Sequence, residues 1–155
     1  MSPAQLDQFD LKILKIIQED ARIAQKDLGE RVNLSTAAVN RRLKKLSNDG
    51  VIKSYTANIE PIFIGLPITI ITMVEILSEQ LEHLDITRKL FSNCEYIQQS
   101  YYVAGEWDFV LIFQVKDMEQ YTDISEKLFI KNNNVKRFKT LVAMKKDKAS
   151  LSIPI

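Results

Sequence analysis

The seven residues Val103–Phe109, VAGEWDF, combine residue types that could do chemistry on a small molecule. Gly105 is one of only four glycines in the chain, and a glycine can adopt a positive φ and let a ligand approach backbone N–H groups closely. Glu106 and Asp108 are two residues apart, so their carboxylates fall on one face of an extended strand. This pattern fits acid–base chemistry or a small-ligand site, and it equally fits a hairpin turn with charges in solvent.

The remaining residues give no support to a catalytic or metal site. Cys94 is the single cysteine and His83 the single histidine, which excludes an internal disulfide framework and a Cys-based zinc site. The sequence contains no recognisable nucleophile–base set and no glycine-rich phosphate loop. We therefore expect no catalytic residues, no bound metal and no cofactor.

A second chemical pattern lies at residues 31–53, where six basic residues stand against a single acidic one, Asp49. The net charge of the whole chain is only +1, so a local patch, and not the whole surface, would have to act on phosphates. The alternatives are a solvated helix face and a three-helix module that binds another protein.

Three predicted helices carry this basic patch. Apolar residues at helical spacing indicate a helix over residues 7–19, with Asp7 placed to cap its start. A shorter helix over residues 24–32 follows, and Ser35 caps a third helix that stops at Gly50. The second and third helices are joined by a short turn, which indicates a helix-turn-helix whose third helix lies in the major groove.

The outward face of the third helix has the residue types that bind DNA and lacks large apolar groups. Arg and Lys side chains neutralise phosphates and pair with guanine, an Asn can pair with adenine, and a Ser at a helix N-terminus can hold a phosphate. This composition favours DNA over a partner protein. The predicted DNA-binding residues are Ser35, Thr36, Ala37, Asn40, Arg41, Arg42, Lys44 and Lys45.

Residues 51–59 alternate between apolar and polar side chains, which predicts a half-buried strand that would serve as a wing. Residues 61–67 hold two prolines and a glycine, and they mark the best domain boundary in the chain. We therefore expect a winged helix-turn-helix domain with its linker strand at residues 1–60 and a second domain at residues 61–155.

The second half of the chain repeats one order of elements twice. Each repeat reads strand, helix, strand, with strands over 68–77, 95–103, 107–115 and 135–144 and helices over about 79–91 and 118–130. This α+β order, βαββαβ, is the ferredoxin-like arrangement: a four-stranded antiparallel sheet with both helices on one face. The second helix is predicted to point Met118, Tyr121, Ile124 and Leu128 inward. The uncovered sheet face carries apolar positions such as Val110 and Ile112, which predicts self-association.

The chain shows neither a signal-peptide pattern nor an apolar run long enough to span a bilayer. We expect a cytoplasmic protein without a membrane partner.

Most of the chain resembles the Lrp/AsnC (feast/famine) transcription regulators. In the first half the family's motifs are matched by DLKIL at 10–14, IQED at 17–20, LGERVNLS at 28–35, RLKKL at 42–46 and GVI at 50–52. In the second half they are matched by VAGEWDF at 103–109, VKDMEQY at 115–121 and SLSIPI at 150–155. The joint order of these motifs is more specific than any one of them.

The resemblance implies a winged helix-turn-helix tied to a ferredoxin-like, RAM-type effector domain. It also implies dimers that often build octamers, and transcription tuned by a small effector, commonly an amino acid. The effector residues that it implies are Tyr101, Val103, Gly105, Glu106, Asp108, Met118, Tyr121, Thr140, Leu141 and Val142.

A free amino acid would find suitable groups among these residues. Its carboxylate needs backbone N–H groups, which the turn at Gly105 can present. Its ammonium needs a carboxylate, which Asp108 or Glu106 could supply, and its side chain needs an apolar wall such as Met118 and Leu141.

The sequence departs from the family's pattern at three places. Thr36-Ala37-Ala38 stands where a proline is common, Ala24 stands where a Ser, Thr or Asn usually caps the second helix, and Asn132-Asn133-Asn134 replaces the usual Pro-Gly. The first change bears on operator sequence, and the second costs about 1 kcal/mol if nothing else caps the helix.

The expected function is a sequence-specific DNA-binding transcription regulator that responds to a small effector. An architectural DNA binder without effector response is the alternative, and a small enzyme using Glu106 and Asp108 is a third reading that lacks the other groups a catalytic site needs.

Overall fold

The computed structural model describes residues 5–155, and these form two compact units. One unit contains three helices and the chain up to Asn58, together with the tail Lys148–Ile155. The other unit is Ile59–Asp147. Apart from the strand expected at residues 51–59, the order of helices and strands is the one expected from the sequence, and the α+β fold class is confirmed.

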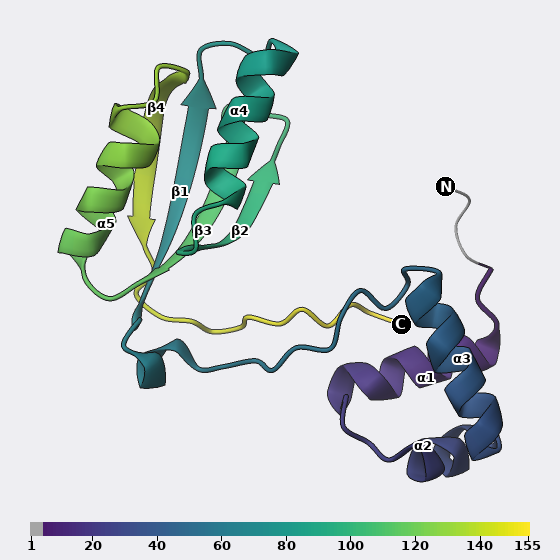
Figure 1. Cartoon of the computed structure of the whole chain (residues 1–155). Coiled ribbons are helices and arrows are strands. Elements are labelled where there is room, and N and C mark those ends of the chain that lie inside the picture. The colour runs from purple at the N-terminus through teal and green to yellow at the C-terminus, as the bar shows by residue number, and fades with distance from the viewer. Residues whose placement is uncertain (1–4) are drawn as a thin grey trace. The chain divides into compact units, whose positions relative to one another are not determined.

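The helical unit is built from α1 (Gln8–Glu19), α2 (Gln25–Val32) and α3 (Thr36–Asn48) (Figure 1). The Asp7 side chain accepts two backbone N–H groups of the first turn of α1, and the Ser35 side chain accepts one at the start of α3. These caps satisfy donors that a helix start leaves free. Apolar residues of all three helices then form one core: Ile13, Leu14, Leu28, Val32, Val39 and Leu46.

Gly29 sets how closely α2 and α3 can approach. A Cβ added at this position would lie 2.6 Å from the carbonyl oxygen of Leu34, which is closer than two such atoms can come. The same turn is fixed by Asn33, whose φ of 56° is left-handed, and by the Leu34 N–H, which donates to the Gly29 carbonyl at 2.9 Å. Glycine at position 29 is therefore required by the tight turn.

The strand and wing predicted at residues 51–59 are not formed. These residues are extended but belong to no sheet, and from Lys53 onward their side chains are exposed. A strand needs a neighbour for its backbone hydrogen bonds, and no strand of the helical unit is available among the described residues. The alternating pattern alone could not reveal that partner.

The tail Lys148–Ile155 packs with the helical unit through Gln18. The Gln18 side-chain amide donates to the Ile153 carbonyl at 3.1 Å and accepts from the Ile153 N–H at 2.8 Å. The boundary proposed from the sequence, after residue 60, placed this tail with the second domain instead.

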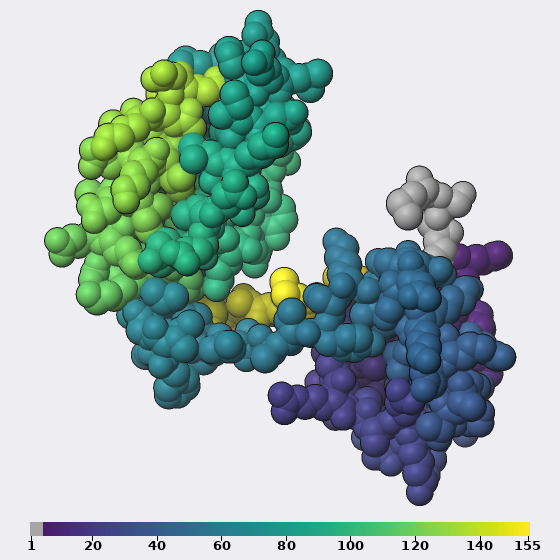
Figure 2. Space-filling view, viewed as in Figure 1, coloured from purple at the N-terminus to yellow at the C-terminus, as the bar shows by residue number. Residues whose placement is uncertain are grey.

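The second unit is a four-stranded antiparallel sheet in the order β2-β3-β1-β4, with two helices on one face (Figure 1). In the same orientation, Figure 2 shows this unit from its helix-covered side, with the teal atoms of α4 beside the green atoms of α5. Its elements are a 3-10 turn η1 (Pro61–Ile64), then β1 (Ile68–Ile76), α4 (Leu81–Ser92), β2 (Ile97–Tyr102), β3 (Phe109–Val115), α5 (Met118–Ser125), a π-helical turn (Glu126–Ile130) and β4 (Val135–Val142). This is the ferredoxin-like arrangement predicted from the repeated βαβ order.

The core of this unit lies between the sheet and its helices. β1 points Ile70, Thr72, Val74 and Ile76 inward, and β3 points Phe109, Leu111 and Phe113 the same way. From the helix side of the sheet, Phe91 packs edge-on against the Phe109 ring and Phe129 packs edge-on against the Phe113 ring. The opposite face is partly exposed and apolar, because Ile71 pairs with Ile112 and Met73 with Val110 across β1 and β3.

Candidate DNA-binding and effector sites

The exposed side of α3 carries most of the predicted DNA-binding residues. Ser35 accepts the Ala38 N–H at 3.2 Å, so its side chain is the N-cap of the helix. Asn40 is half-buried, and the others on this side are exposed: Thr36, Ala37, Arg41, Lys44 and Lys45. Together they form a basic stripe that begins at the positive end of a helix dipole, an arrangement suited to phosphate oxygens.

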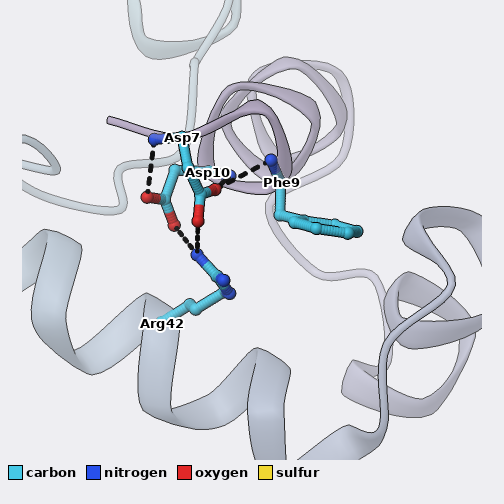
Figure 3. Close-up of polar contacts among 4 residues, drawn as sticks. All are labelled: Asp7, Phe9, Asp10 and Arg42. Carbon is cyan, nitrogen blue, oxygen red and sulfur yellow. Dashed lines mark hydrogen bonds and ion pairs between the residues drawn. The ribbon is translucent and has the colours of Figure 1, made fainter. Parts of the chain in front are cut away.

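Arg42 does not belong to this free stripe (Figure 3). Its Nη1 donates to the Asp7 carboxylate at 2.7 Å and to the Asp10 carboxylate at 2.8 Å. Its guanidinium also lies over the Phe9 ring, 5.4 Å from the centroid. Arg42 as a DNA-binding group stays a prediction, and its Nη1 donates to two carboxylates of the same chain.

The charges of this cluster reinforce one another. Hydrogen bonds from the backbone N–H of Asp10 and from Arg42 lower the pKa of the Asp7 carboxyl. The hydrogen bonds of Arg42 to Asp10 and then to Asp7 raise the pKa of its guanidinium. Both shifts favour the charged forms of Asp7 and Arg42.

The VAGEWDF stretch is a turn that leads from β2 to β3 and is fastened to β1. Gly105 has a φ of +155°, and space lies open where a Cβ would stand. The Asp108 carboxylate accepts the Ile76 N–H at 2.7 Å, and the Asp108 N–H donates to the Val74 carbonyl at 2.9 Å. Val103 closes the turn by donating to the Asp108 carbonyl at 2.8 Å. Asp108 thus extends the pairing of β1 with β3 beyond Phe109, whether or not its carboxylate also meets a ligand.

Glu106 is likewise engaged within the chain. It accepts a hydrogen bond from Arg137 at 3.2 Å, and the Arg137 guanidinium lies 4.5 Å from the centroid of the Trp107 ring. Arg137 also pairs with Glu75, which takes a second ion pair from Lys136 at 2.5 Å. Hydrogen bonds from Lys136 and then Arg137 lower the pKa of Glu75.

This charged cluster was missed in the sequence. Glu75 and Arg137 are 62 residues apart and meet only because β1 and β4 pair in that register. The available signal was the run of basic residues on β4, opposite the only acidic residue of β1.

The other predicted effector residues lie on α5 and β4. The Tyr121 hydroxyl is buried and shares hydrogen bonds with Thr72 at 2.8 Å and Thr140 at 2.7 Å. Met118 was expected in the inner stripe of its helix but is 43% exposed, because it is the first residue of α5 and lies beyond the sheet. Leu141 and Val142 are exposed at the end of β4.

Within one copy, the predicted effector residues form two separate groups. One group, Tyr101, Val103, Gly105, Glu106 and Asp108, lies where β3 begins. In the other group Met118 follows the end of β3, and Leu141 and Val142 on β4 lie opposite Ile71 and Ile70 of β1, level with Ile112 and Phe113 in the middle of β3. The seven residues of β3 span about 20 Å at the usual rise per residue. A hollow of about 500 Å³ in this unit contains none of them; it is lined by Ile64, Gly65, Leu66, Glu95, Tyr96, Lys116 and Gln120.

Comparison with known families matches both units. Residues 6–53 match a family model described as winged helix-turn-helix DNA-binding, and residues 69–153 match the Lrp/AsnC ligand binding domain. The chain belongs to the Lrp/AsnC family. It is a DNA-binding transcription regulator with a ligand-binding domain, and it is not an enzyme.

Individual relatives agree with this assignment. The chain is 36% identical over 151 residues to an uncharacterized HTH-type transcriptional regulator of Sinorhizobium fredii, covering 97% of this chain and 89% of that one. It is 33% identical over 123 residues to the glutamate uptake regulatory protein of Zymomonas mobilis, covering 79% and 75%.

Solved structures agree as well. The crystal structure of an AsnC family regulator from Agrobacterium tumefaciens is 28% identical, covers 96% of this chain and 97% of that one, and has a TM-score of 0.90. A transcriptional regulator of Neisseria meningitidis, solved as an L-Met complex, is 25% identical with 97% coverage of both chains and a TM-score of 0.90. In this Lrp/AsnC chain, no helix within residues 5–155 is long and apolar enough to cross a membrane.

Proposed function

We propose that this chain binds specific double-stranded DNA through the exposed stripe of α3 and that a free amino acid controls this binding. The observation that carries the proposal is the stripe itself: Arg41, Lys44 and Lys45 are exposed on the helix that follows the tight turn of a winged helix-turn-helix. Arg and Lys on such a helix contact phosphates and base edges in the major groove. A regulator of this kind works on DNA in the cytoplasm.

An amino acid as the effector is supported by the ligand-binding domain and by a solved relative in complex with L-Met. In this chain the turn at Gly105 could offer N–H groups to a carboxylate, and Asp108 keeps one carboxylate oxygen beyond the one that accepts the Ile76 N–H. Met118 and Leu141, both exposed, could form an apolar wall.

The two groups of effector residues also support an assembly of several copies. Because the turn at Gly105 and Met118 lie at opposite ends of β3, one copy cannot surround a small molecule with both. Association of copies can bring the turn of one next to Met118 and Leu141 of another. The apolar open face of the sheet favours such association, and we propose a homodimer that assembles further, to an octamer.

The DNA-binding role is tested by mobility shift at several salt concentrations. Arg41→Ala and Lys44→Ala should each weaken binding and lower the slope of log affinity against log salt by about 0.9, because each removes one phosphate contact. Lys127→Ala, on the exposed side of the π-helical turn after α5, is the matched control and should leave both unchanged. Unaltered binding by both α3 variants would contradict the proposed face.

The effector role is tested by a thermal-shift screen of the twenty amino acids. Asp108→Asn is the informative variant, because Asn keeps an acceptor for the Ile76 N–H while removing the negative charge that an ammonium needs. A specific shift in the wild type should be lost in this variant and kept in Asp123→Asn, an exposed control on α5. An undiminished shift in Asp108→Asn would place the site elsewhere.

An architectural DNA binder without effector response is the second candidate. One observation favours it: Asp108 and Glu106, the two carboxylates offered to an ammonium, already have partners in the chain. The same screen decides between the two, since no amino acid should shift the thermal stability of a protein without an effector site.

A further inference from the structure

Arg42 differs from the exposed basic residues of α3 because its guanidinium is ion-paired with two carboxylates. Arg41, one residue earlier, is exposed, whereas the Arg42 side chain is 24% exposed and its Nη1 bridges two carboxylates (Figure 3). One of these, the side chain of Asp10, is only 9% exposed. The Nη1 group of Arg42 is therefore committed to two carboxylates of the same chain before DNA binds.

The two carboxylates are themselves fixed by the start of α1. The Asp7 carboxylate accepts the N–H groups of Phe9 and Asp10, each at 2.8 Å, and the Asp10 carboxylate accepts the Asp7 N–H at 3.2 Å. They cannot shift without undoing this reciprocal cap. The Phe9 ring lies under the guanidinium and limits its movement further.

We propose that Arg42 is a positioning residue for DNA recognition. By joining α3 to the capped start of α1, it fixes the rotation of α3 about its own axis, so that Arg41, Lys44 and Lys45 meet the groove in register, and it does not itself neutralise a phosphate. The proposal rests on the DNA-binding role proposed for α3.

Such a role separates two properties of DNA binding. Non-specific binding follows the number of neutralised phosphates and tolerates small changes in helix orientation. Sequence readout depends on the alignment of donors with base edges, so it does not tolerate small changes in helix orientation. Loss of the Arg42 bridge should therefore reduce affinity for a specific duplex while leaving the salt slope and the non-specific affinity unchanged.

Substitution of the acidic partners distinguishes a positioning role of Arg42 from a phosphate-binding role, because the two roles predict opposite changes in DNA affinity. Neutralising Asp10 removes a negative charge near a polyanion, so simple electrostatics predicts tighter DNA binding, and tighter still if Arg42 becomes free to bind a phosphate. If Arg42 positions α3, the same change should weaken binding to the specific duplex.

The experiment compares full-length variants on two DNA probes. One probe is a duplex selected by the wild-type chain from random-sequence DNA, and the other is a scrambled duplex of the same length and composition. The positioning variants are Arg42→Met, Asp10→Asn and Asp7→Asn, and Asn is chosen at residue 7 because it caps a helix as well as Asp does. The controls are Arg41→Met on the exposed stripe and Glu30→Gln, an exposed carboxylate on α2.

We expect Arg42→Met and Asp10→Asn to bind the selected duplex about tenfold or more weakly and the scrambled duplex within about twofold of wild type, with the salt slope kept. The affinity of Asp7→Asn for the selected duplex should lie between that of these two variants and that of wild type. Arg41→Met should weaken binding to both probes and lower the slope by about 0.9. Glu30→Gln should bind both probes slightly more tightly.

Three results would overturn the proposal. The first is a fall in salt slope for Arg42→Met like that of Arg41→Met, which would make Arg42 a phosphate ligand. The second is tighter binding of the selected duplex by Asp10→Asn or Asp7→Asn. The third is wild-type behaviour of Arg41→Met on both probes, which would refute the DNA-binding face itself and leave Arg42 nothing to position. Asp7→Asn keeps the test decisive if Arg42→Met loses its helical circular dichroism.

Discussion

At the scale of single residues, the Asp7 carboxylate at the start of α1 makes the stability of the helical unit depend on pH. Its folded-state pKa is lowered, chiefly by the Asp10 N–H and also by Arg42. A carboxyl whose pKa falls on folding adds stability that is complete above its unfolded pKa, about 3.9, and is lost as pH falls through the lower folded value. The helical unit should therefore lose the contribution of Asp7 only below about pH 4.

We expect Asp7→Asn to remove this dependence. Hydrogen exchange of α1 amides, followed from pH 6 to pH 3, should show wild type more protected than the variant at the upper end and the gap closing as pH falls. Glu30→Gln should run parallel to wild type throughout. A gap that stays constant down to pH 3 would contradict the role of the Asp7 charge.

The Tyr121 hydroxyl is the second residue whose role the structure defines. It is buried between Thr72 and Thr140, so Tyr121→Phe leaves the buried Thr72 hydroxyl without this partner. We expect a loss of about 1–3 kcal/mol in the free energy of unfolding. Trp107, the only tryptophan, reports on this unit by fluorescence during urea unfolding. Tyr101→Phe, at an exposed hydroxyl, is the control and should cost less than about 0.5 kcal/mol.

At the scale of elements, the turn between α2 and α3 depends on a missing side chain. Alanine is the better helix former by about 1 kcal/mol, so propensity alone predicts that Gly29→Ala stabilises α2. The Cβ would instead lie 2.6 Å from the Leu34 carbonyl oxygen, a backbone atom that cannot move without opening the turn. We expect a net loss of about 1–3 kcal/mol, measured by hydrogen exchange of α2 and α3 amides. A gain in protection would mean that the turn relaxes freely.

The start of α2 offers the opposite change. Ala24 is in the extended conformation of an N-cap, but its side chain accepts no hydrogen bond. Ala24→Ser should stabilise the helical unit by about 1 kcal/mol, because the hydroxyl can accept a free N–H of the first turn. The matched control is Ala21→Ser, an exposed position outside any helix, which should have no effect on the same exchange rates.

Periodicity and caps were sufficient to predict most elements, and contacts between distant segments were not predictable from them. Asp7, Ser35 and the inner faces of β1 and β3 are local patterns, and the structure follows them. The segment at 51–59 has the pattern of a strand but no partner. The Asn134 side chain bonds both backbone groups of Ser78, 56 residues away, a contact that the local sequence does not indicate.

The candidate sites show the same division. Residue types and helical spacing were enough to predict the exposed stripe on α3. They could not reveal that Arg42 turns inward, because its two partners are 32 and 35 residues away on another helix. The two groups of effector residues follow from sheet topology, which motif spacing does not contain.

At the scale of the whole molecule, each unit has its own hydrophobic core, and one apolar surface remains uncovered. The open face of the sheet brings Ile112 beside Ile71, and Ile71 beside Leu141 of β4. If copies associate through this face, Ile112→Lys places a charge in the interface, where burial without a partner is costly. We expect the variant to have a lower mass by light scattering than the wild type.

The helix-covered side of the sheet supplies the control for this last prediction. Ser92→Lys adds the same charge at an exposed position at the end of α4 and should keep the wild-type mass. Because one copy holds the turn at Gly105 and the group at Met118 at opposite ends of β3, dissociation should also abolish the thermal shift produced by an amino acid. An Ile112→Lys variant that dissociates but retains the shift would show that the effector site is complete within one chain, and the two groups could not then form a shared pocket.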